Sequence, residues 1–175
     1  MADRALVAYA SRTGSTNGIA NAIAKTLCVK GISADVSIVN HGLDLSRYST
    51  VVVGSPVRAG FLMREARAFV RKNRAGLAGK TVAYFCVCMT MKEDTPKNRA
   101  AAEAYLRPLV RIRAPDMTGV FAGAFDLSKL GGFFGWVMRR DKSGKVKTED
   151  CRDWNKIAAW SESLATMVLS KGGAS

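Results

Sequence analysis

The chain has 175 residues, of which 48% are hydrophobic and 23% charged, a composition typical of a folded protein and unlike that of a disordered one. This length favours one domain over residues 1–175. Four scattered cysteines exclude a disulfide scaffold, and the single histidine argues against histidine-based zinc sites and a histidine-driven catalytic triad. No stretch reaches the ~20 apolar residues of a membrane-spanning helix. The N-terminus lacks a signal-peptide pattern, so we expect a cytoplasmic chain with reduced thiols.

The net charge of +13 is concentrated in the middle of the chain, where residues 58–113 carry 13 basic and 4 acidic residues. A positive field of this kind favours an anionic partner, such as phospholipid, nucleic acid, an acidic protein or a polycarboxylate. A solvated surface that keeps the protein soluble explains the same charge, because charge alone names no partner. Few aromatic residues are interleaved with these basic residues, which disfavours nucleic acid.

The start of the chain pairs a buried strand with an amphipathic helix. Residues 5–10 form a continuous apolar run, which predicts a strand covered on both faces of a parallel sheet. Ile19, Ile23 and Leu27 then recur every four residues, as expected for the apolar face of a helix. Gly31 is suited to end that helix.

Further strands and a second helix follow in the same alternation. Residues 33–39, 50–54 and 81–88 predict short strands. Residues 55–60 are predicted as a loop because they combine proline, glycine and small residues. A helix is predicted after this loop, and the side chains expected to face inward from it are those of Leu62, Ala66, Phe69 and Val70.

The last third of the chain carries two more helices and a strand. Thr95 and Pro96 predict a helix start, with the threonine as cap and the proline at the first helical position, and Pro108 is predicted to kink or end that helix. Residues 119–125 predict a fifth strand, and residues 126–147 have no regular pattern. A final helix over about 150–170 is expected to have on one face Trp154, Ile157, Ala158, Ser161, Leu164, Ala165 and Val168.

Strands that alternate with helices predict an α/β fold, in which helices cover both faces of a doubly wound, five-stranded parallel sheet. An insertion over residues 127–147 follows the fifth strand. In such sheets ligands bind beyond the carboxyl ends of the strands, so the loop after the first strand is the first candidate site.

That loop, residues 11–16, is rich in hydroxyl groups and leads into a helix N-terminus, whose free N–H groups and dipole favour a phosphate. Gly14 permits close backbone approach, and further hydrogen bonds can come from Ser11, Thr13, Ser15 and Thr16. The loop lacks the glycine patterns of sites for nucleoside triphosphates and dinucleotides. One phosphate held without lysine or metal suits a mononucleotide such as FMN, although an ordinary capped helix start has the same composition.

The sequence resembles the flavodoxin family. Its segment from Val7 to Thr16 matches that family's FMN phosphate loop, and residues 54–60 and 88–90 match by position the loops that flank the flavin ring. The resemblance implies a flavodoxin-like fold with strand order 2-1-3-4-5 and bound FMN. The cofactor-binding residues that it implies are Ser11, Arg12, Thr13, Gly14, Ser15, Thr16, Pro56, Val57, Arg58, Ala59, Gly60, Cys88, Met89 and Thr90.

Within this family the chain most resembles the menaquinone-dependent protoporphyrinogen dehydrogenases. Similar features are the small-residue loop centred on Arg58, residues 122–124 after the fifth strand, and the pair Asp153-Trp154 at the start of the last helix, whereas the insertion differs in detail. The resemblance implies an FMN-dependent oxidoreductase that passes electrons from a reduced substrate to a quinone. The alternatives are a soluble flavodoxin that carries electrons between redox proteins and a basic flavoprotein that docks on a membrane.

Three further features bear on this choice. Arg58 beside the ring would stabilise anionic reduced flavin and raise its potential, which suits an enzyme that reduces quinone, whereas a solvent-facing Arg58 would not. Cys86 and Cys88 share one face of a strand and are either a redox pair or apolar packing residues. Residues 127–140 combine aromatic and basic side chains, which suits an anionic membrane surface on the cytoplasmic side, a cover over the sheet edge, or a dimer interface.

Overall fold

The structure, a computed structural model, describes residues 4–11, 14–40, 42–125 and 149–172. Its main sheet has five parallel strands in the order β2-β1-β3-β5-β6, which is the predicted order once the strands are counted along the chain. The bounds of these strands are Arg4–Tyr9 (β1), Ser33–Ile38 (β2), Thr50–Arg58 (β3), Thr81–Val87 (β5) and Met117–Phe121 (β6). A short antiparallel strand, β4 (Phe61–Leu62), pairs with β3 and was not predicted.

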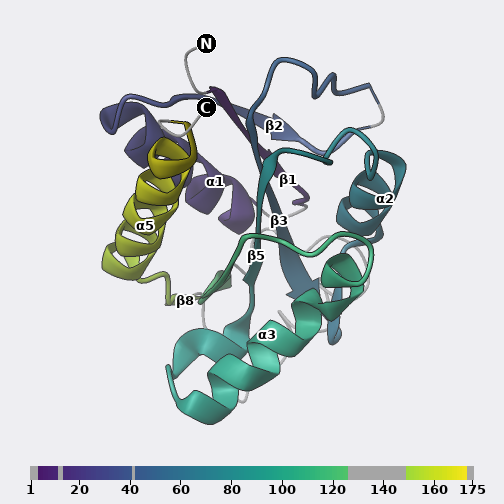
Figure 1. Cartoon of the computed structure of the whole chain (residues 1–175). Coiled ribbons are helices and arrows are strands. Elements are labelled where there is room, and N and C mark those ends of the chain that lie inside the picture. Colours follow the sequence, from purple (N-terminus) through teal and green to yellow (C-terminus); the bar gives the residue numbers. More distant parts are fainter. Residues whose placement is uncertain (1–3, 12–13, 41, 126–148, 173–175) are drawn as a thin grey trace, which may run out of the picture.

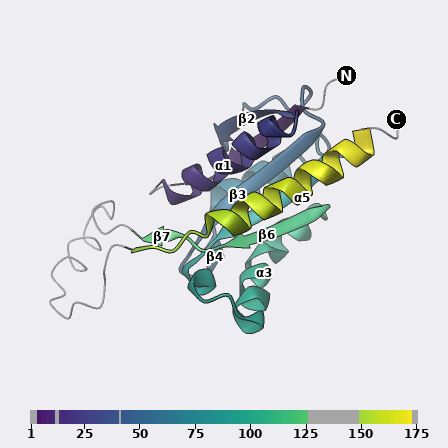
Figure 2. The ribbon, with the colours of Figure 1, turned by 90° about the vertical axis from the view of Figure 1, so that its left-hand side faces the viewer.

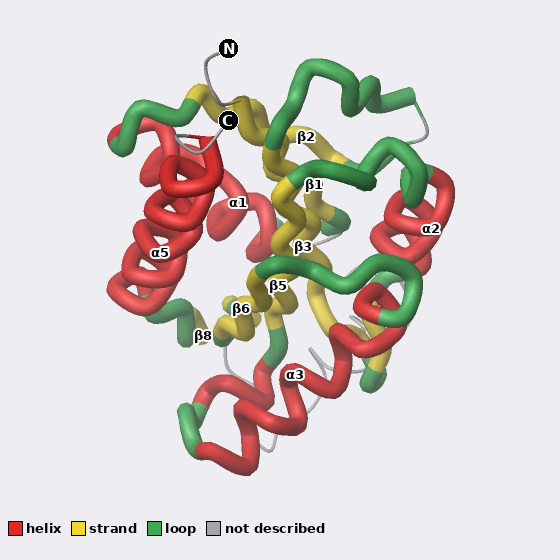
Figure 3. Tube along the Cα trace, viewed as in Figure 1, coloured by secondary structure: helices red, strands yellow, loops and turns green. Residues whose placement is uncertain are grey.

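Helices cover both faces of this sheet. Helices α1 (Ser15–Val29) and α5 (Trp154–Gly172) lie on one face, and α2 (Arg64–Lys72) and α3 (Pro96–Val110) lie on the other (Figures 1 and 2). The strands lie between the two helical layers in Figure 3. Because both faces are covered, buried apolar residues form a cluster on each side, one containing Ile23 and Leu164 and the other Phe69 and Leu106. The predicted doubly wound fold is confirmed.

Local signals set the starts of two helices, and the first of these starts was predicted. The Thr95 hydroxyl accepts a hydrogen bond from the N–H of Asn98 at 3.1 Å, and Pro96 is the first residue of α3. Before α5, the Asp153 carboxylate accepts hydrogen bonds at 3.1 Å from two N–H groups of the first turn. These caps satisfy backbone donors that the helices themselves leave unpaired.

The prediction of a loop over residues 55–60 is wrong. Strand β3 continues to Arg58, and Ala59 and Gly60 then turn the chain back into β4. Their φ angles are 48° and 82°, as a two-residue hairpin turn of type I′ requires. Leu62 therefore lies in β4 and not in the following helix. Pairing with β4 gives the end of β3 the hydrogen bonds that allow it to remain a strand.

Two helix predictions are also corrected. Pro108 was predicted to kink or end its helix, and an end at Pro108 is wrong because α3 continues two residues further to Val110. In α5, Ile157 and Leu164 are buried as predicted, but Trp154 and Ala158 are exposed. Trp154 lies at the first residue of α5, where its ring contacts an arginine and not the sheet.

The segment predicted as the fifth strand, residues 119–125, belongs to two separate strands in the structure. Strand β6 begins at Met117 and ends at Phe121, and a separate strand β7 (Ala124–Phe125) pairs antiparallel with β8 (Glu149–Asp150). The bend between β6 and β7 separates this small ladder from the main sheet. The irregular segment predicted over 126–147 and the insertion over 127–147 lie outside the described residues, which resume at Glu149.

Candidate functional site

The three segments predicted to hold a cofactor follow β1, β3 and β5, which are neighbours in the sheet. Because these strands are parallel, the segments lie along one edge, where ligands of such sheets bind. The structure therefore brings together the β1–α1 turn, the β3–β4 hairpin and the segment after β5. Arg12 and Thr13, which belong to the first of these, lie outside the described residues.

The β1–α1 turn presents the N-terminus of α1 at this edge. Gly14 precedes the helix with φ 88°, a conformation that a side chain would strain, and its N–H donates to the Ser11 hydroxyl at 3.0 Å. Within the described part of the chain, no side chain caps the helix and its first turn has no acidic residue. Free N–H groups and an uncompensated helix dipole favour an anion at this position.

The first turn of α1 also contains a buried hydroxyl. The side chain of Thr16 is fully buried, and its Oγ1 has no hydrogen-bond partner among the described residues, while Ser15 beside it is half-buried. A buried hydroxyl without a partner costs about 1–3 kcal/mol, which a polar ligand would relieve. An unpartnered hydroxyl, an uncapped helix and a hydroxyl-bearing turn fit an anionic group such as a phosphate.

The β3–β4 hairpin forms the second side of the site. Pro56 and Val57 are half-buried, and Arg58 is exposed near the tip with Ala59 and Gly60. The hairpin is held at its base by the buried Ser55 hydroxyl, which accepts a hydrogen bond from the N–H of Met63 and donates one to the Pro56 carbonyl, both at 3.0 Å. Val57 packs against a cluster that includes Cys88, so the hairpin contacts the segment after β5.

The segment after β5 turns into the short 3-10 helix η1 (Met89–Lys92). Cys88, which precedes it, is buried, Met89 is exposed and Thr90 is half-buried. The neighbouring Cys86 thiol and the N–H groups of η1 lower the pKa of Cys88 to about 7, while the Cys86 thiol itself donates a hydrogen bond to the Ala102 carbonyl at 3.5 Å. The neighbouring Cys88 and burial raise the pKa of Cys86. Of the two neighbouring thiols, Cys88 is therefore the one that loses its proton more readily.

Ion pairs attach the end of η1 to the start of α5. Lys92 binds Glu149 at 2.7 Å, and Lys156 binds Asp94 at 2.6 Å, where Arg99 adds a third charge at 2.8 Å. The hydrogen bonds from Lys156 and Arg99 lower the pKa of Asp94 below its usual value. These contacts join the segment that follows β5 to the chain on either side of Cys151, and so hold one wall of the site.

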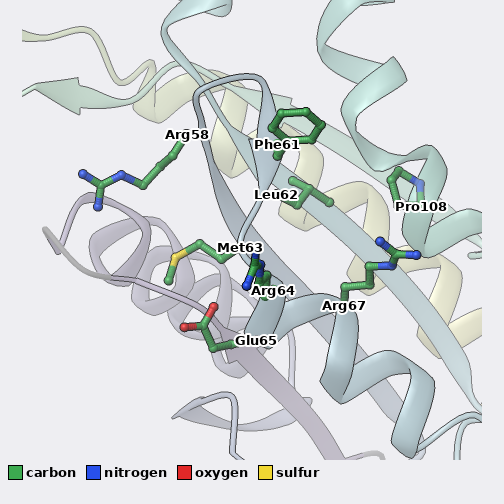
Figure 4. A pocket seen from close by; sticks show the side chains of 8 residues that line it. All are labelled: Arg58, Phe61, Leu62, Met63, Arg64, Glu65, Arg67 and Pro108. Atoms are coloured by element: carbon green, nitrogen blue, oxygen red, sulfur yellow. The ribbon is translucent and has the colours of Figure 1, made fainter.

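A groove of about 640 Å³ lies beside the hairpin (Figure 4). Its lining combines apolar and charged side chains: Arg58, Phe61, Leu62, Met63, Arg64, Glu65, Arg67 and Pro108. In Figure 4 the side chains of Phe61 and Leu62 lie on the side of Arg67 and Pro108, whereas Arg58 and Met63 point the other way. The sequence analysis missed this groove. Its only local signal is an apolar run, residues 61–63, that leads directly into a basic helix.

The described residues contain no cluster of side chains that could hold a metal ion. None of the described helices is long and apolar enough to cross a membrane.

The fold and this edge site define a flavodoxin-like protein. The flavodoxin domain family matches residues 6–150, and the chain belongs to that family. It is 25% identical over 177 residues to the protoporphyrinogen IX dehydrogenase (quinone) of Escherichia coli strain K12, an alignment that covers 94% of this chain and 96% of the relative. The predicted resemblance to the family and to this branch is confirmed.

Solved structures show the same fold. A flavodoxin from the domain Archaea superposes with a TM-score of 0.58 at 16% identity, covering 94% of this chain and 98% of that one. The flavodoxin of Streptococcus pneumoniae TIGR4 gives a TM-score of 0.57 at 19% identity, covering 96% of this chain and 99% of that one. Membership of the flavodoxin domain family implies that the protein binds a flavin.

Proposed function

We propose that the protein is an FMN-dependent oxidoreductase that passes electrons from a reduced organic substrate to a quinone. The observation that carries the proposal is the uncapped N-terminus of α1 with the buried, unpartnered Thr16 hydroxyl, at the same edge as the hairpin and η1. When bound, FMN would supply the redox chemistry. The protein's contribution is to hold the cofactor, set its charge environment and admit the substrate.

The cofactor's phosphate would lie at the β1–α1 turn, where the N–H groups of α1 and the hydroxyls of Ser11, Thr13, Ser15 and Thr16 can donate hydrogen bonds. The remaining predicted residues would contact the ring: Pro56 to Gly60 from the hairpin and Cys88 to Thr90 from η1. The exposed guanidinium of Arg58 would favour added negative charge near the ring. This field suits an enzyme that passes electrons to an acceptor of higher potential.

The groove beside the hairpin is the proposed substrate site. Phe61, Leu62 and Pro108 provide apolar surface, and Arg67 on the same side provides a cation that can bind a carboxylate. An apolar molecule that carries carboxylates matches both properties. The Escherichia coli relative is named for protoporphyrinogen IX and quinone, which supports a substrate and an acceptor of these kinds.

A carrier of electrons between redox proteins is the second candidate, and the flavodoxins among the structural neighbours favour it. A carrier needs an exposed ring edge but no substrate groove. The groove of about 640 Å³ and the positive charge around it therefore favour the enzyme.

We also propose that the protein is cytoplasmic and docks on the inner face of an anionic membrane, where quinones reside. The segment predicted for this contact, residues 127–140, lies outside the described residues, as does any dimer contact it makes. A described feature supports the same proposal: Phe61 is 76% exposed near the tip of the hairpin, beside Arg58 and Arg64. An exposed aromatic side chain flanked by cations suits the headgroup region of a bilayer.

The test begins with the cofactor of the purified protein. About one FMN per chain should be released on denaturation. The flavoprotein should then be reduced by protoporphyrinogen in one two-electron step and reoxidised by a menaquinone analogue. Release of FAD, or no flavin after reconstitution, would contradict the cofactor. Reduction in two well-separated one-electron steps, with no transfer to quinone, would favour the carrier.

The membrane contact has a separate test. The protein should co-sediment with vesicles that contain anionic phospholipid, less so as the salt concentration rises, and only weakly with neutral vesicles. Phe61→Ser should weaken this binding and leave the FMN content unchanged. Wild-type protein that ignores anionic vesicles at low salt would refute the docking.

A further inference from the structure

Arg152 lies between β8 and α5 in a tightly defined position. Its Nε and Nη2 bind the Asp150 carboxylate at 2.8 and 2.5 Å, and the guanidinium lies over the ring of Trp154, 4.6 Å from the centroid. The side chain is only 19% exposed. Asp150 and Trp154 thus fix the plane of the guanidinium, and Nη1 is the nitrogen not used by the carboxylate.

This Nη1 is directed at the first turns of α1. A Cβ built on Gly18 would lie 2.6 Å from Nη1 and 3.7 Å from the ring of Trp154. The absence of a side chain at Gly18 therefore creates the space that the guanidinium occupies. Among the described residues, Nη1 has no hydrogen-bond partner, whereas the other side-chain nitrogens of Arg152 are bound to Asp150.

A cation is unexpected at this end of a helix. The N-terminus of α1 already has a partial positive charge of about half an elementary charge from the helix dipole, and an added cation is unfavourable there. The first turn contains no acidic residue to offset it, and the buried Thr16 hydroxyl lacks a partner in the described structure. With a dianion bound between them, the helix N-terminus and Arg152 would both be attracted to the ligand, which would outweigh their mutual repulsion. The dianion would also accept a hydrogen bond from the Thr16 hydroxyl.

We propose that Arg152 is an additional phosphate-binding residue, whose Nη1 supplies positive charge to the phosphate group of FMN at the N-terminus of α1. Asp150 and Trp154 act as positioning residues for Arg152, and Gly18 admits it. This inference rests on the proposed function, because it assigns a role at the same cofactor site. It differs in its consequence: Arg152 serves the phosphate end of the cofactor alone, so it discriminates FMN from riboflavin.

The test titrates apo-protein with FMN and with riboflavin and follows the quenching of flavin fluorescence. Arg152→Ala should lower the affinity for FMN about 10- to 100-fold, the range for a lost hydrogen bond to a charged group, and should leave the affinity for riboflavin unchanged. Arg152→Lys should restore part of the loss, since it keeps the charge without the fixed planar geometry. Arg71→Ala, which removes an exposed arginine from the opposite face of the sheet, should change neither affinity.

Gly18→Ala provides a second variant that retains Arg152. The new methyl group would displace the flexible end of the arginine, so FMN should again bind more weakly and riboflavin as before. Alanine favours helix more than glycine by about 1 kcal/mol, so this variant should fold. If wild type binds neither flavin, the proposed function fails. If wild type binds FMN tightly but both variants retain its affinity, or lose FMN and riboflavin equally, the role of Arg152 is refuted.

Discussion

Arg58 and Phe61 are paired across the β3–β4 hairpin, and both side chains are exposed at the carboxyl edge of the sheet. The backbone pairing sets both residues at a two-residue turn beside the groove, with Phe61 on the side of Arg67 and Pro108 and Arg58 on the other side. The hairpin thus connects the proposed cofactor site with the proposed substrate site, and substitutions in it should separate effects on flavin potential from effects on folding.

Replacing Arg58 with glutamate should lower the reduction potential of the bound flavin. The change exchanges a positive for a negative charge near the ring, which disfavours added electrons by an amount on the order of tens of millivolts at a partly solvated site. Equilibrium titration of the holoprotein against a reference dye measures the shift. The matched control is Arg71→Glu on α2, which makes the same change of charge away from this edge. Equal potentials in Arg58→Glu and wild type would show that Arg58 lies away from the ring.

Thr16→Val should have opposite effects on the apo- and holoproteins. In the apoprotein it removes a buried hydroxyl without a partner, so the free energy of unfolding should rise by up to about 1–3 kcal/mol. For FMN it removes a hydrogen bond to phosphate, so the affinity should fall about 10- to 100-fold. Chemical denaturation of apoprotein and flavin titration measure the two effects.

Thr50 is the internal control for Thr16. Its Oγ1 is also buried without a partner among the described residues, but it lies at the start of β3, away from the carboxyl edge. Thr50→Val should therefore stabilise the apoprotein and leave FMN affinity unchanged. A loss of FMN in both variants would indicate a general effect on the fold and would remove Thr16 from the phosphate site.

Cys88 should titrate near neutral pH in the apoprotein. Its pKa is lowered from 9.0 to about 7, chiefly by the neighbouring Cys86 thiol. Because the folded pKa is depressed, the thiolate stabilises the fold fully above pH 9.0, and this contribution is lost as the pH falls through about 7. Thiolate absorbance in the ultraviolet should show a midpoint near 7 that disappears in Cys88→Ser.

The partner thiol supplies the control for this titration. Cys86→Ala removes the neighbouring thiol that lowers the pKa of Cys88, so the midpoint of Cys88 should rise toward 9.0. An unchanged midpoint in Cys86→Ala would mean that η1 alone stabilises the thiolate. The sequence left open whether Cys86 and Cys88 are a redox pair or apolar packing residues. A redox pair needs a thiolate at neutral pH, so a Cys88 midpoint near 7 would favour the redox pair.

The hairpin turn should respond to substitution at Ala59. This residue has φ 48°, a left-handed conformation that costs a residue with a Cβ about 1–2 kcal/mol and that asparagine adopts more readily. Ala59→Asn creates the Asn-Gly pair favoured in such turns and should raise the free energy of unfolding by up to about 1 kcal/mol. Gly60→Ala should lower it by a similar amount. Thermal unfolding checks both, and destabilisation by Ala59→Asn would rule out this turn type.

The layout of the fold could be read from local patterns. Apolar runs such as residues 5–10 and the four-residue spacing of Ile19, Ile23 and Leu27 reflect the backbone periods of buried strands and amphipathic helices. Capping residues such as Thr95 act on adjacent N–H groups, so they too are visible in a short stretch of sequence. The hydroxyl-rich turn before α1 was found for the same reason, because a phosphate site at a helix N-terminus is built almost entirely from consecutive residues.

What the sequence could not show depends on contacts between distant segments. Residues 55–60 have the composition of a loop, yet β3 extends to Arg58 because β4 returns to pair with it, and this pairing overrides the unfavourable conformation of Ala59. Arg152 and Gly18 lie far apart in the chain, and only the packing of α5 against α1 brings them together. The sequence by itself thus determined the order of the five main strands and their helices and the position of the hydroxyl-rich turn before α1, because these follow from local backbone periodicity and composition. The groove and the arginine at α1 were decided by tertiary structure, because each requires side chains from separate elements to meet.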